Sequence, residues 1–305
     1  MTVLIIGAPK EEHSAFIHHK ITERGKQAVY FDTRHFPAAT LINMHLGPQA
    51  SPPGEIIQPN QPPLALDSIE AVYWRYHMGL QLPQLPTPFL MEMAHREIES
   101  ALGSLFRNLS CRWVNSPQAV ALHAYKAHQL SLMHQAGIRV PQTLISNDPQ
   151  AVLAFYEAHH GQVIYKPVRG GAHAGRLTPD VLTPEKLADL SNAPSQFQEL
   201  IEGVDIRVYA VKEELFAGEI RSRTLDFRDD PAAPIVPIAL PDNVARDCRK
   251  IMDLLGLVYT GIDVRRTPAG EYVFLEANPC PMFMHFEQQA NYPISDRLVD
   301  LLIHG

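Results

Sequence analysis

The sequence is poor in several features that define common protein classes. Its three cysteines, Cys111, Cys248 and Cys280, lie far apart and form no Cys-x-x-Cys pair. This argues against a zinc knuckle and a disulfide framework, and it is typical of a reducing compartment. No apolar run approaches the ~20 residues that a membrane span needs. The apolar N-terminal run has no basic residue before it and no signal-type cleavage site after it. These features predict a cytoplasmic protein with no membrane partner.

Two common nucleotide-binding fingerprints and an excess of positive charge are also missing. The first apolar run ends at Gly7, and residues 8–10 do not continue it as Gly-x-Gly-x-x-Gly. The Gly-x-x-x-x-Gly-Lys-Ser/Thr motif of P-loop enzymes does not occur either. There are 26 Lys and Arg against 33 Asp and Glu, a net charge of −7. A nucleic acid is therefore not expected as the main partner.

What is present predicts a globular α/β protein. The 305 residues are 46% hydrophobic, which is enough for a sizeable core and about two domains. Val3–Ile6 and Ala28–Asp32 read as strands on either side of a helix from Glu11 to Arg24. This β-α-β opening is typical of an open α/β sheet. Residues 47–65 hold many prolines and are expected to form a loop.

The later elements follow from apolar periodicity and from turn residues. One helix is expected to begin at Pro117, with Ser116 as its N-cap, and to run to about Gln135. The other expected helices are Phe89–Arg107, one opening at Asp148-Pro149, Pro241–Leu255 and Ile294–Ile303. The other expected strands are Ala71–Trp74, Val140–Ser146, Gln162–Lys166, Phe197–Ile201, Ile206–Val211, Leu215–Arg221, Tyr259–Val264 and Glu271–Ala277.

The strongest chemical signal lies on the last two expected strands. Glu276 and Asn278 are two residues apart, so their side chains point to the same face. Asp263 lies on the partner strand of the hairpin and can share that face. Three oxygen donors of this kind suit Mg²⁺, which keeps waters and phosphate oxygens in its other positions. The alternative is a solvated hairpin face without a metal.

Two further segments suggest anion binding. Lys166 ends an apolar strand just before a glycine-rich loop that contains Gly170 and Gly171, where backbone N–H groups can approach phosphates. An exposed edge lysine beside an ordinary loop is an equally good interpretation. Residues 198–207 run from an apolar strand through acidic residues to Arg207; an acid can hold ribose hydroxyls and an arginine can hold phosphate. Taken alone, this segment favours turn chemistry and a surface ion pair.

In this order, the segments resemble the ATP-grasp superfamily, from about Arg112 to the last residue. The ordered set is Ser116-Pro117 with Lys126, Lys166 with its glycine loop, the strand at Glu199, Asp205-x-Arg207, Arg221, Asp263 and Glu276-x-Asn278. The resemblance implies an α/β (α+β) ATP-grasp fold after an N-terminal open α/β (pre-ATP-grasp) domain. The implied divisions are 1–112, 113–200 with the glycine-rich loop, and 201–305 with the metal site.

The resemblance also implies a role for each matching residue, with ATP and Mg²⁺ as cofactors. The resemblance implies that the α- and β-phosphates are bound by Lys126 and Lys166 with the loop of Gly170 and Gly171, and that the γ-phosphate or an acyl phosphate is bound by Arg207 and Arg221. It implies that the adenine edge is bound by Glu199 with the backbone of Leu200 and Ile201, and the ribose by Asp205 or Glu202. It also implies that one or two Mg²⁺ ions are bound by Asp263, Glu276 and Asn278.

The implied reaction is phosphorylation of a carboxylate by ATP, followed by displacement of phosphate by an amine, hydroxyl or thiol. Two branches are most similar: ligases that close side-chain rings in microviridin-type peptides, and ligases that add glutamate to a ribosomal protein. Trp74-Arg75, residues 113–117 and residues 271–276 resemble the first branch, whereas residues 279–283 lack a glycine expected after Asn278 in both. The expected partner is a peptide or amino-acid substrate, including a precursor peptide. A nucleotide-binding module without turnover, a kinase on the same fold and a homodimer all stay open.

Overall fold

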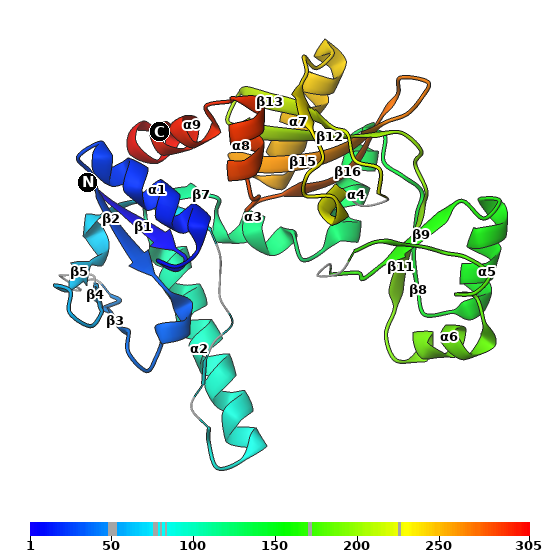
Figure 1. Ribbon diagram of the computed structural model, residues 1–305. Helices are drawn as coiled ribbons and strands as arrows, with labels where there is room; N and C mark the ends of the chain where they lie inside the picture. Colours follow the sequence, from blue (N-terminus) through cyan, green and yellow to red (C-terminus); the bar gives the residue numbers. More distant parts are fainter. Residues whose placement is uncertain (48–53, 76–78, 80, 83, 170–172, 225–226) are drawn as a thin grey trace. The chain divides into compact units, whose positions relative to one another are not determined.

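The structure, a computed structural model, describes residues 1–47, 54–75, 79, 81–82, 84–169, 173–224 and 227–305. The chain forms two compact units (Figure 1). The first unit joins Met1–Pro117 to Pro293–Gly305, and the second is Gln118–Tyr292. In the part of the chain that is described, no helix is both long and apolar enough to cross a membrane.

The first unit is built on a parallel sheet in the order β2-β1-β6-β7. Its strands are β1 (Thr2–Ile6), β2 (Gln27–Phe31), β6 (Ile69–Trp74) and β7 (Arg112–Val114), and its helices include α1 (Glu12–Glu23) and α2 (Pro88–Asn108). All five residues of β1 are buried, which explains its unbroken apolar sequence. The predicted β-α-β opening is confirmed by the parallel pairing of β1 with β2.

The expectation of a loop over residues 47–65 is wrong for part of that segment. A small antiparallel sheet joins β3 (Leu41–Met44), β4 (Gly54–Ile57) and β5 (Leu64–Ala65). The prolines after β4 fall in the turn before β5, where they remove no ladder hydrogen bond. Gly54 has a φ of +136°, and a Cβ there would lie 2.0 Å from the carbonyl oxygen of Asn43, so the pairing needs glycine. Short 3₁₀ turns at Thr33–His35 and Leu66–Ser68 complete this region.

The last helix, α9 (Ile294–His304), belongs to the first unit and not to the residues that precede it. Its apolar side is fully buried at Leu298 and Val299. Lys20 of α1 donates to Asp296 at 2.9 Å, and Arg112 of β7 donates to the carbonyl of Leu302 at 3.0 Å. These contacts tie α9 to α1 and β7, which lie far from it in the sequence. The proposed divisions at 112/113 and 200/201 stay predictions.

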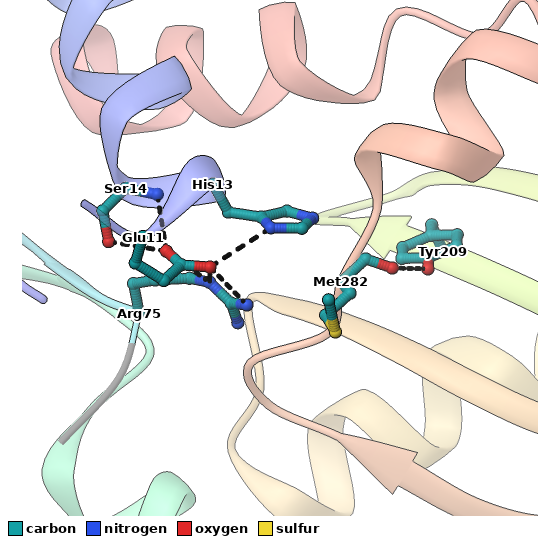
Figure 2. Close-up of polar contacts among 6 residues, drawn as sticks. All are labelled: Glu11, His13, Ser14, Arg75, Tyr209 and Met282. Atoms are coloured by element: carbon teal, nitrogen blue, oxygen red, sulfur yellow. Dashed lines mark hydrogen bonds and ion pairs between the residues drawn. The ribbon is translucent and has the colours of Figure 1, made fainter. Parts of the chain in front are cut away.

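A buried polar cluster closes the end of the parallel sheet in the first unit (Figure 2). Glu11 caps α1, because its carboxylate accepts from the backbone N–H of Ser14 at 2.7 Å and from its hydroxyl at 2.8 Å. Arg75, just after β6, donates to the same carboxylate at 3.0 Å, and His13 lies 3.2 Å from it. Burial alone would raise the pKa of Glu11. Hydrogen bonds from His13, Arg75 and Ser14, with the charge of Arg75, outweigh burial and lower it well below its usual range.

Replacing Glu11 with glutamine is expected to destabilise the protein by about 2 kcal/mol at neutral pH, because a charge-assisted cap and ion pair are lost. A carboxyl whose pKa is lower in the folded state stabilises fully above its unfolded pKa, and this contribution fades as the pH falls further. The difference between wild type and Glu11→Gln should therefore shrink between pH 7 and pH 3.5. Urea unfolding of both proteins at the two pH values measures this, with the exposed Glu23→Gln as control. A difference that stays constant with pH would contradict the assignment.

The second unit contains two antiparallel sheets. The smaller has the order β10-β9-β11-β8, with β8 (Thr143–Ser146), β9 (Val163–Lys166), β10 (Gly175–Arg176) and β11 (Ser195–Glu199). Its helices are α5 (Pro149–Ala158) and α6 (Pro184–Ala188), followed by a 3₁₀ turn at Asp189–Ser191. Val152 of α5 and Phe197 of β11 belong to the core cluster of this part. The other sheet face carries Gln196, which is fully buried and lies opposite Lys166.

The larger sheet has the order β14-β13-β12-β15-β16. Its strands are β12 (Val204–Val211), β13 (Glu214–Ile220), β14 (Ile235–Pro237), β15 (Tyr259–Arg266) and β16 (Tyr272–Asn278), with a 3₁₀ turn at Phe227–Asp229. Helix α7 (Asp242–Leu255) packs Cys248 and Ile251 against Val208 and Ile262, and α8 (Met284–Ala290) follows β16. Successive side chains of a strand point to opposite faces, so the residues of β12 and β15 that alternate with Val208 and Ile262 point to the face away from α7.

The helix expected from Pro117 to about Gln135 is in fact two helices, α3 (Pro117–Leu122) and α4 (Lys126–Gln135). Tyr125 leaves the helical conformation, with φ −107° and ψ 63°. No glycine or proline marks this break, so the apolar pattern read as one continuous helix. The break makes Lys126 the first residue of α4.

Candidate functional site

Three charged side chains form a row across the larger sheet. Arg207 of β12 lies opposite Asp263 of β15, and Asp263 lies opposite Glu276 of β16. Side chains directly opposite in neighbouring strands have Cβ atoms about 5 Å apart and share one face. Residues next to them in the sequence, such as Ile206 and Ile262, belong to the core on the other face. The row is therefore a built feature of the sheet and not a chance cluster on a loop.

Each carboxylate of this row forms an ion pair with a cation. Arg207 donates to Asp263, and Lys126 of α4 donates to Glu276. Burial raises the pKa of Asp263, and the neighbouring charge of Glu276 adds to this against the opposing effect of Arg207. Burial would also raise the pKa of Glu276, but the charges of Lys126 and Lys166 outweigh it and lower that pKa. The site thus keeps two carboxylates and three cations together.

The position of Arg207 is fixed by its surroundings. A Cβ on Gly261, the neighbouring position on β15, would lie 2.4 Å from the Arg207 guanidinium, so only glycine leaves room for it. The Tyr209 ring lies 5.0 Å from the guanidinium carbon, within the range of a cation–π contact. The Tyr209 hydroxyl in turn donates to the carbonyl of Met282 (Figure 2). Sequence reasoning missed both Gly261 and Tyr209, because neither stands out from the apolar strands around it.

Asn278 completes the oxygen donors of the predicted metal site. It lies two residues beyond Glu276 on β16, and its side-chain oxygen accepts from the backbone N–H of Cys280 at 2.9 Å. Among the described residues, no three His, Cys, Asp or Glu side chains converge as a metal cluster. Two carboxylates and one amide oxygen fit a Mg²⁺ ion that takes its other ligands from water and phosphate, but not an all-protein metal cage.

Gln129 on α4 holds the strand that carries Glu276 and Asn278. Its side-chain amide donates to the carbonyl of Ala277 at 3.0 Å and accepts from the N–H of Ala277 at 2.8 Å. Strand β16 is at the edge of its sheet, so these two backbone groups have no neighbouring strand to pair with. Gln129 therefore joins α4, which begins at Lys126, to β16. Nothing in its local sequence indicates this role.

Replacing Gln129 with leucine is expected to cost about 2–4 kcal/mol, because two buried backbone groups of Ala277 lose their partners. Urea unfolding measures the loss. The same variant should require a higher Mg²⁺ concentration for ADP formation, since Glu276 and Asn278 flank the freed residue. Gln135→Leu, at an exposed position of the same helix, is the control. A stability within 0.5 kcal/mol of wild type, roughly the effect of a neutral surface change, would contradict this role.

The smaller sheet contributes Lys166 and the residues expected at the adenine edge. Lys166 ends β9, and its charge lowers the pKa of Glu276 on the larger sheet. The Glu199 carboxylate accepts from the backbone N–H of Gln142 at 3.0 Å, and the N–H of Leu200 donates to the carbonyl of Gln162 at 2.9 Å. Ile201 is buried beside them. Gly170 and Gly171 lie outside the described residues.

The remaining candidates make their ion pairs outside the charged row, although the charge of Asp205 helps to raise the pKa of Asp263. Asp205 forms a two-pronged ion pair with Arg265, at 3.0 and 3.1 Å, while Glu202 is exposed. Arg221 is 60% exposed and donates to Glu219 at 3.0 Å. Gly218 lies opposite Arg207, and Glu219 is the next residue on the same strand. Because successive side chains of a strand point to opposite faces, the Glu219 side chain is on the face of the sheet away from Arg207. The structure therefore separates Arg221 from Arg207.

Lys126 paired with Glu276 and Arg207 paired with Asp263, in a unit built on two antiparallel sheets, are what the resemblance to the ATP-grasp class of enzymes implies. The chain belongs to the RimK-like ATP-grasp family: residues 123–302 match the RimK-like ATP-grasp domain. Residues 2–121 match the MvdD pre-ATP-grasp domain. The predicted fold and the predicted resemblance are both confirmed.

Relatives of known structure cover the whole chain. The macrocyclase MdnC from Microcystis aeruginosa, solved with its precursor peptide MdnA, has a TM-score of 0.88 and 28% identity over 100% of both chains. The ATP-grasp ligase PsnB, solved with a minimal precursor variant, Mg and ADP, has a TM-score of 0.82 and 31% identity over 99% of this chain and 97% of its own. The α-aminoadipate–LysW ligase LysX of Sulfurisphaera tokodaii is 25% identical over 210 residues, 64% of this chain and 73% of its own. The prediction of a ligase that uses ATP and Mg²⁺ is thereby confirmed.

Proposed function

We propose that this ligase activates a side-chain carboxylate of a precursor peptide as an acyl phosphate. An amine or hydroxyl of the same peptide then attacks the acyl carbon, phosphate leaves, and an amide or ester ring closes. The charged row of Lys126, Glu276, Asp263 and Arg207 supports the phosphoryl-transfer half of this proposal. The peptide half is supported by MdnC and PsnB, which match this chain over nearly its full length and were solved with precursor peptides.

The proposed roles follow from the charges already in place. Asp263, Glu276 and Asn278 would hold Mg²⁺, which neutralises phosphate charge when bound. Lys126 and Lys166 would contact the α- and β-phosphates, because a polyphosphate competes with Glu276 for their ammonium groups. These are electrostatic and positioning roles, which dominate catalysis of phosphoryl transfer.

The ion pairs support a choice between the residues that the sequence offered for the ribose and for the γ-phosphate or acyl phosphate. We assign the ribose hydroxyls to Glu202, because both oxygens of Asp205 are already engaged by Arg265. We assign the γ-phosphate or the acyl phosphate to Arg207. Arg221 would have to leave Glu219 to reach it.

Mass spectrometry with parallel ADP detection tests the proposal. The protein is incubated with Mg-ATP and a short peptide encoded beside its gene, and separately with amino-acid mixtures. A peptide that loses one water for each ADP formed is the expected result. A tight Mg-ATP complex that forms no ADP with any substrate would contradict the ligase proposal and favour a nucleotide-binding module. A stable phosphorylated product would identify a kinase instead.

A second candidate is addition of an amino acid to a protein or peptide, as the name of LysX states for that relative. LysX is less similar to this chain and matches 64% of it, against the full-length match of the macrocyclase. In the same experiment, a product that gains the mass of one amino-acid residue would favour this candidate over ring closure.

A further inference from the structure

The segment between the two sheets of the second unit is held from both sides. Strand β11 ends at Glu199 and β12 begins at Val204, which leaves residues 200–203 as a short linker. The N–H of Leu200 donates to the carbonyl of Gln162, the residue just before β9 of the smaller sheet. The carbonyl of the next residue, Ile201, accepts from the Nη1 of Arg265 on the larger sheet, at 3.0 Å. Successive linker residues are thus fixed to different sheets.

Arg265 can fix the linker because its guanidinium is itself fixed. Its Nε and Nη2 donate to the two carboxylate oxygens of Asp205 at 3.0 and 3.1 Å. The two residues lie directly opposite each other on β12 and β15, and their side chains are only 13% and 14% exposed. A planar guanidinium bound at two points has one orientation, so its third nitrogen is directed at the linker.

One backbone donor of the linker is left open by this arrangement. Among the residues that the structure describes, the N–H of Ile201 has no hydrogen-bond partner, although Ile201 is buried. A buried N–H without a partner is rare in proteins and indicates a group that a ligand can satisfy. On its Watson–Crick edge, adenine presents an acceptor at N1, whereas guanine presents an N–H donor there. A fixed N–H donor at this point suits adenine and opposes guanine.

We infer that Arg265, oriented by Asp205, is a positioning residue that sets base selectivity by fixing the linker around Ile201. The inference rests on the proposed function, since it takes this linker as the adenine edge. Arg265 does not contact the base itself; it acts through the backbone of Ile201. Without Arg265, the Ile201 carbonyl loses its anchor and the adjoining peptide planes can reorient, so either base can find a partner.

Calorimetric titration of the full chain with Mg-ADP and, separately, with Mg-GDP tests this without any peptide substrate. Wild type should bind ADP more tightly than GDP by about 100-fold, near the upper end of what one mismatched, buried hydrogen bond supplies. Arg265→Met should weaken ADP binding about tenfold and reduce the ADP-to-GDP ratio at least about tenfold. Arg266→Met is the matched control. Arg266 is the next residue on β15 and pairs with Glu219 at 2.6 Å, so its replacement should leave the ADP-to-GDP ratio unchanged.

An ADP-to-GDP ratio that stays at the wild-type value in Arg265→Met would overturn the inference, whatever happens to stability. So would a wild type that does not prefer ADP. Where Arg265→Met fails to fold, Arg265→Lys decides, because lysine keeps the charge but cannot bind both Asp205 oxygens and the Ile201 carbonyl in one plane. A reduced ratio in this variant supports the inference and an unchanged ratio overturns it. Failure of the proposed function would be visible separately, as unmodified peptide with the nucleotide selectivity intact.

Discussion

Replacing Glu276 with glutamine is expected to lower the rate of ADP formation by at least about a thousandfold while the protein stays folded. Glutamine has the same shape and can still accept a hydrogen bond from Lys126, so the packing between α4 and β16 is kept. The negative charge is lost, and with it one of the two carboxylates proposed to hold Mg²⁺. Charge stabilisation of this kind is the largest contribution available to phosphoryl transfer.

The measurement is ADP release with peptide, followed as Mg²⁺ is raised, together with the thermal unfolding midpoint. Higher Mg²⁺ should recover part of the lost rate, because Asp263 and Asn278 remain. Glu271→Gln is the control: it removes a glutamate just before the same strand, half-exposed and paired with Arg139 at 3.2 Å. We expect that variant to stay within twofold of wild type, as is typical of exposed ion pairs. Turnover of Glu276→Gln at the wild-type rate would rule out the metal assignment.

The sequence predicted the part of the site that depends on the two-residue alternation within a single strand. Glu276 and Asn278 are two residues apart in a strand, and strand alternation alone places them on one face. The hairpin indicated that Asp263 can share this face, but its position opposite Glu276 also depends on a register shift between Asp263 and Val264. No residue type in the turn specifies that shift, so the sequence could indicate the hairpin but not which side chains meet.

The parts that the sequence did not reach depend on partners far along the chain. The sequence predicted that Asp205 binds ribose and that Arg207 binds phosphate. In the structure, Arg265, sixty residues after Asp205, binds the Asp205 carboxylate. Gln129 and Ala277 are 148 residues apart. Charge and hydrogen-bond pairing of this kind follows from the strand order of the sheet, and a single sequence does not encode strand order in any local pattern.

The second large effect is expected at Arg207, where stability and activity can be separated. Arg207→Met leaves the Asp263 carboxylate largely buried and without its partner, which typically costs about 3–5 kcal/mol. ADP formation should also be lost, because the cation proposed for the transferred phosphate is gone. Adding Asp263→Asn to this variant removes the unpaired charge. The double variant should therefore regain most of the stability and none of the activity.

Urea unfolding and ADP release of wild type, both single variants and the double variant form a complete double-mutant cycle. A coupling of several kcal/mol between Arg207 and Asp263 is expected, since neither charge is stable in this position alone. Arg249→Met is the control, an exposed arginine that bonds the backbone of Glu213 and should change stability by less than about 0.5 kcal/mol. If Asp263→Asn fails to restore stability, the contact of Arg207 with the Tyr209 ring, and not its charge, holds the sheet face together. Restored activity in the double variant would show instead that phosphoryl transfer does not use Arg207.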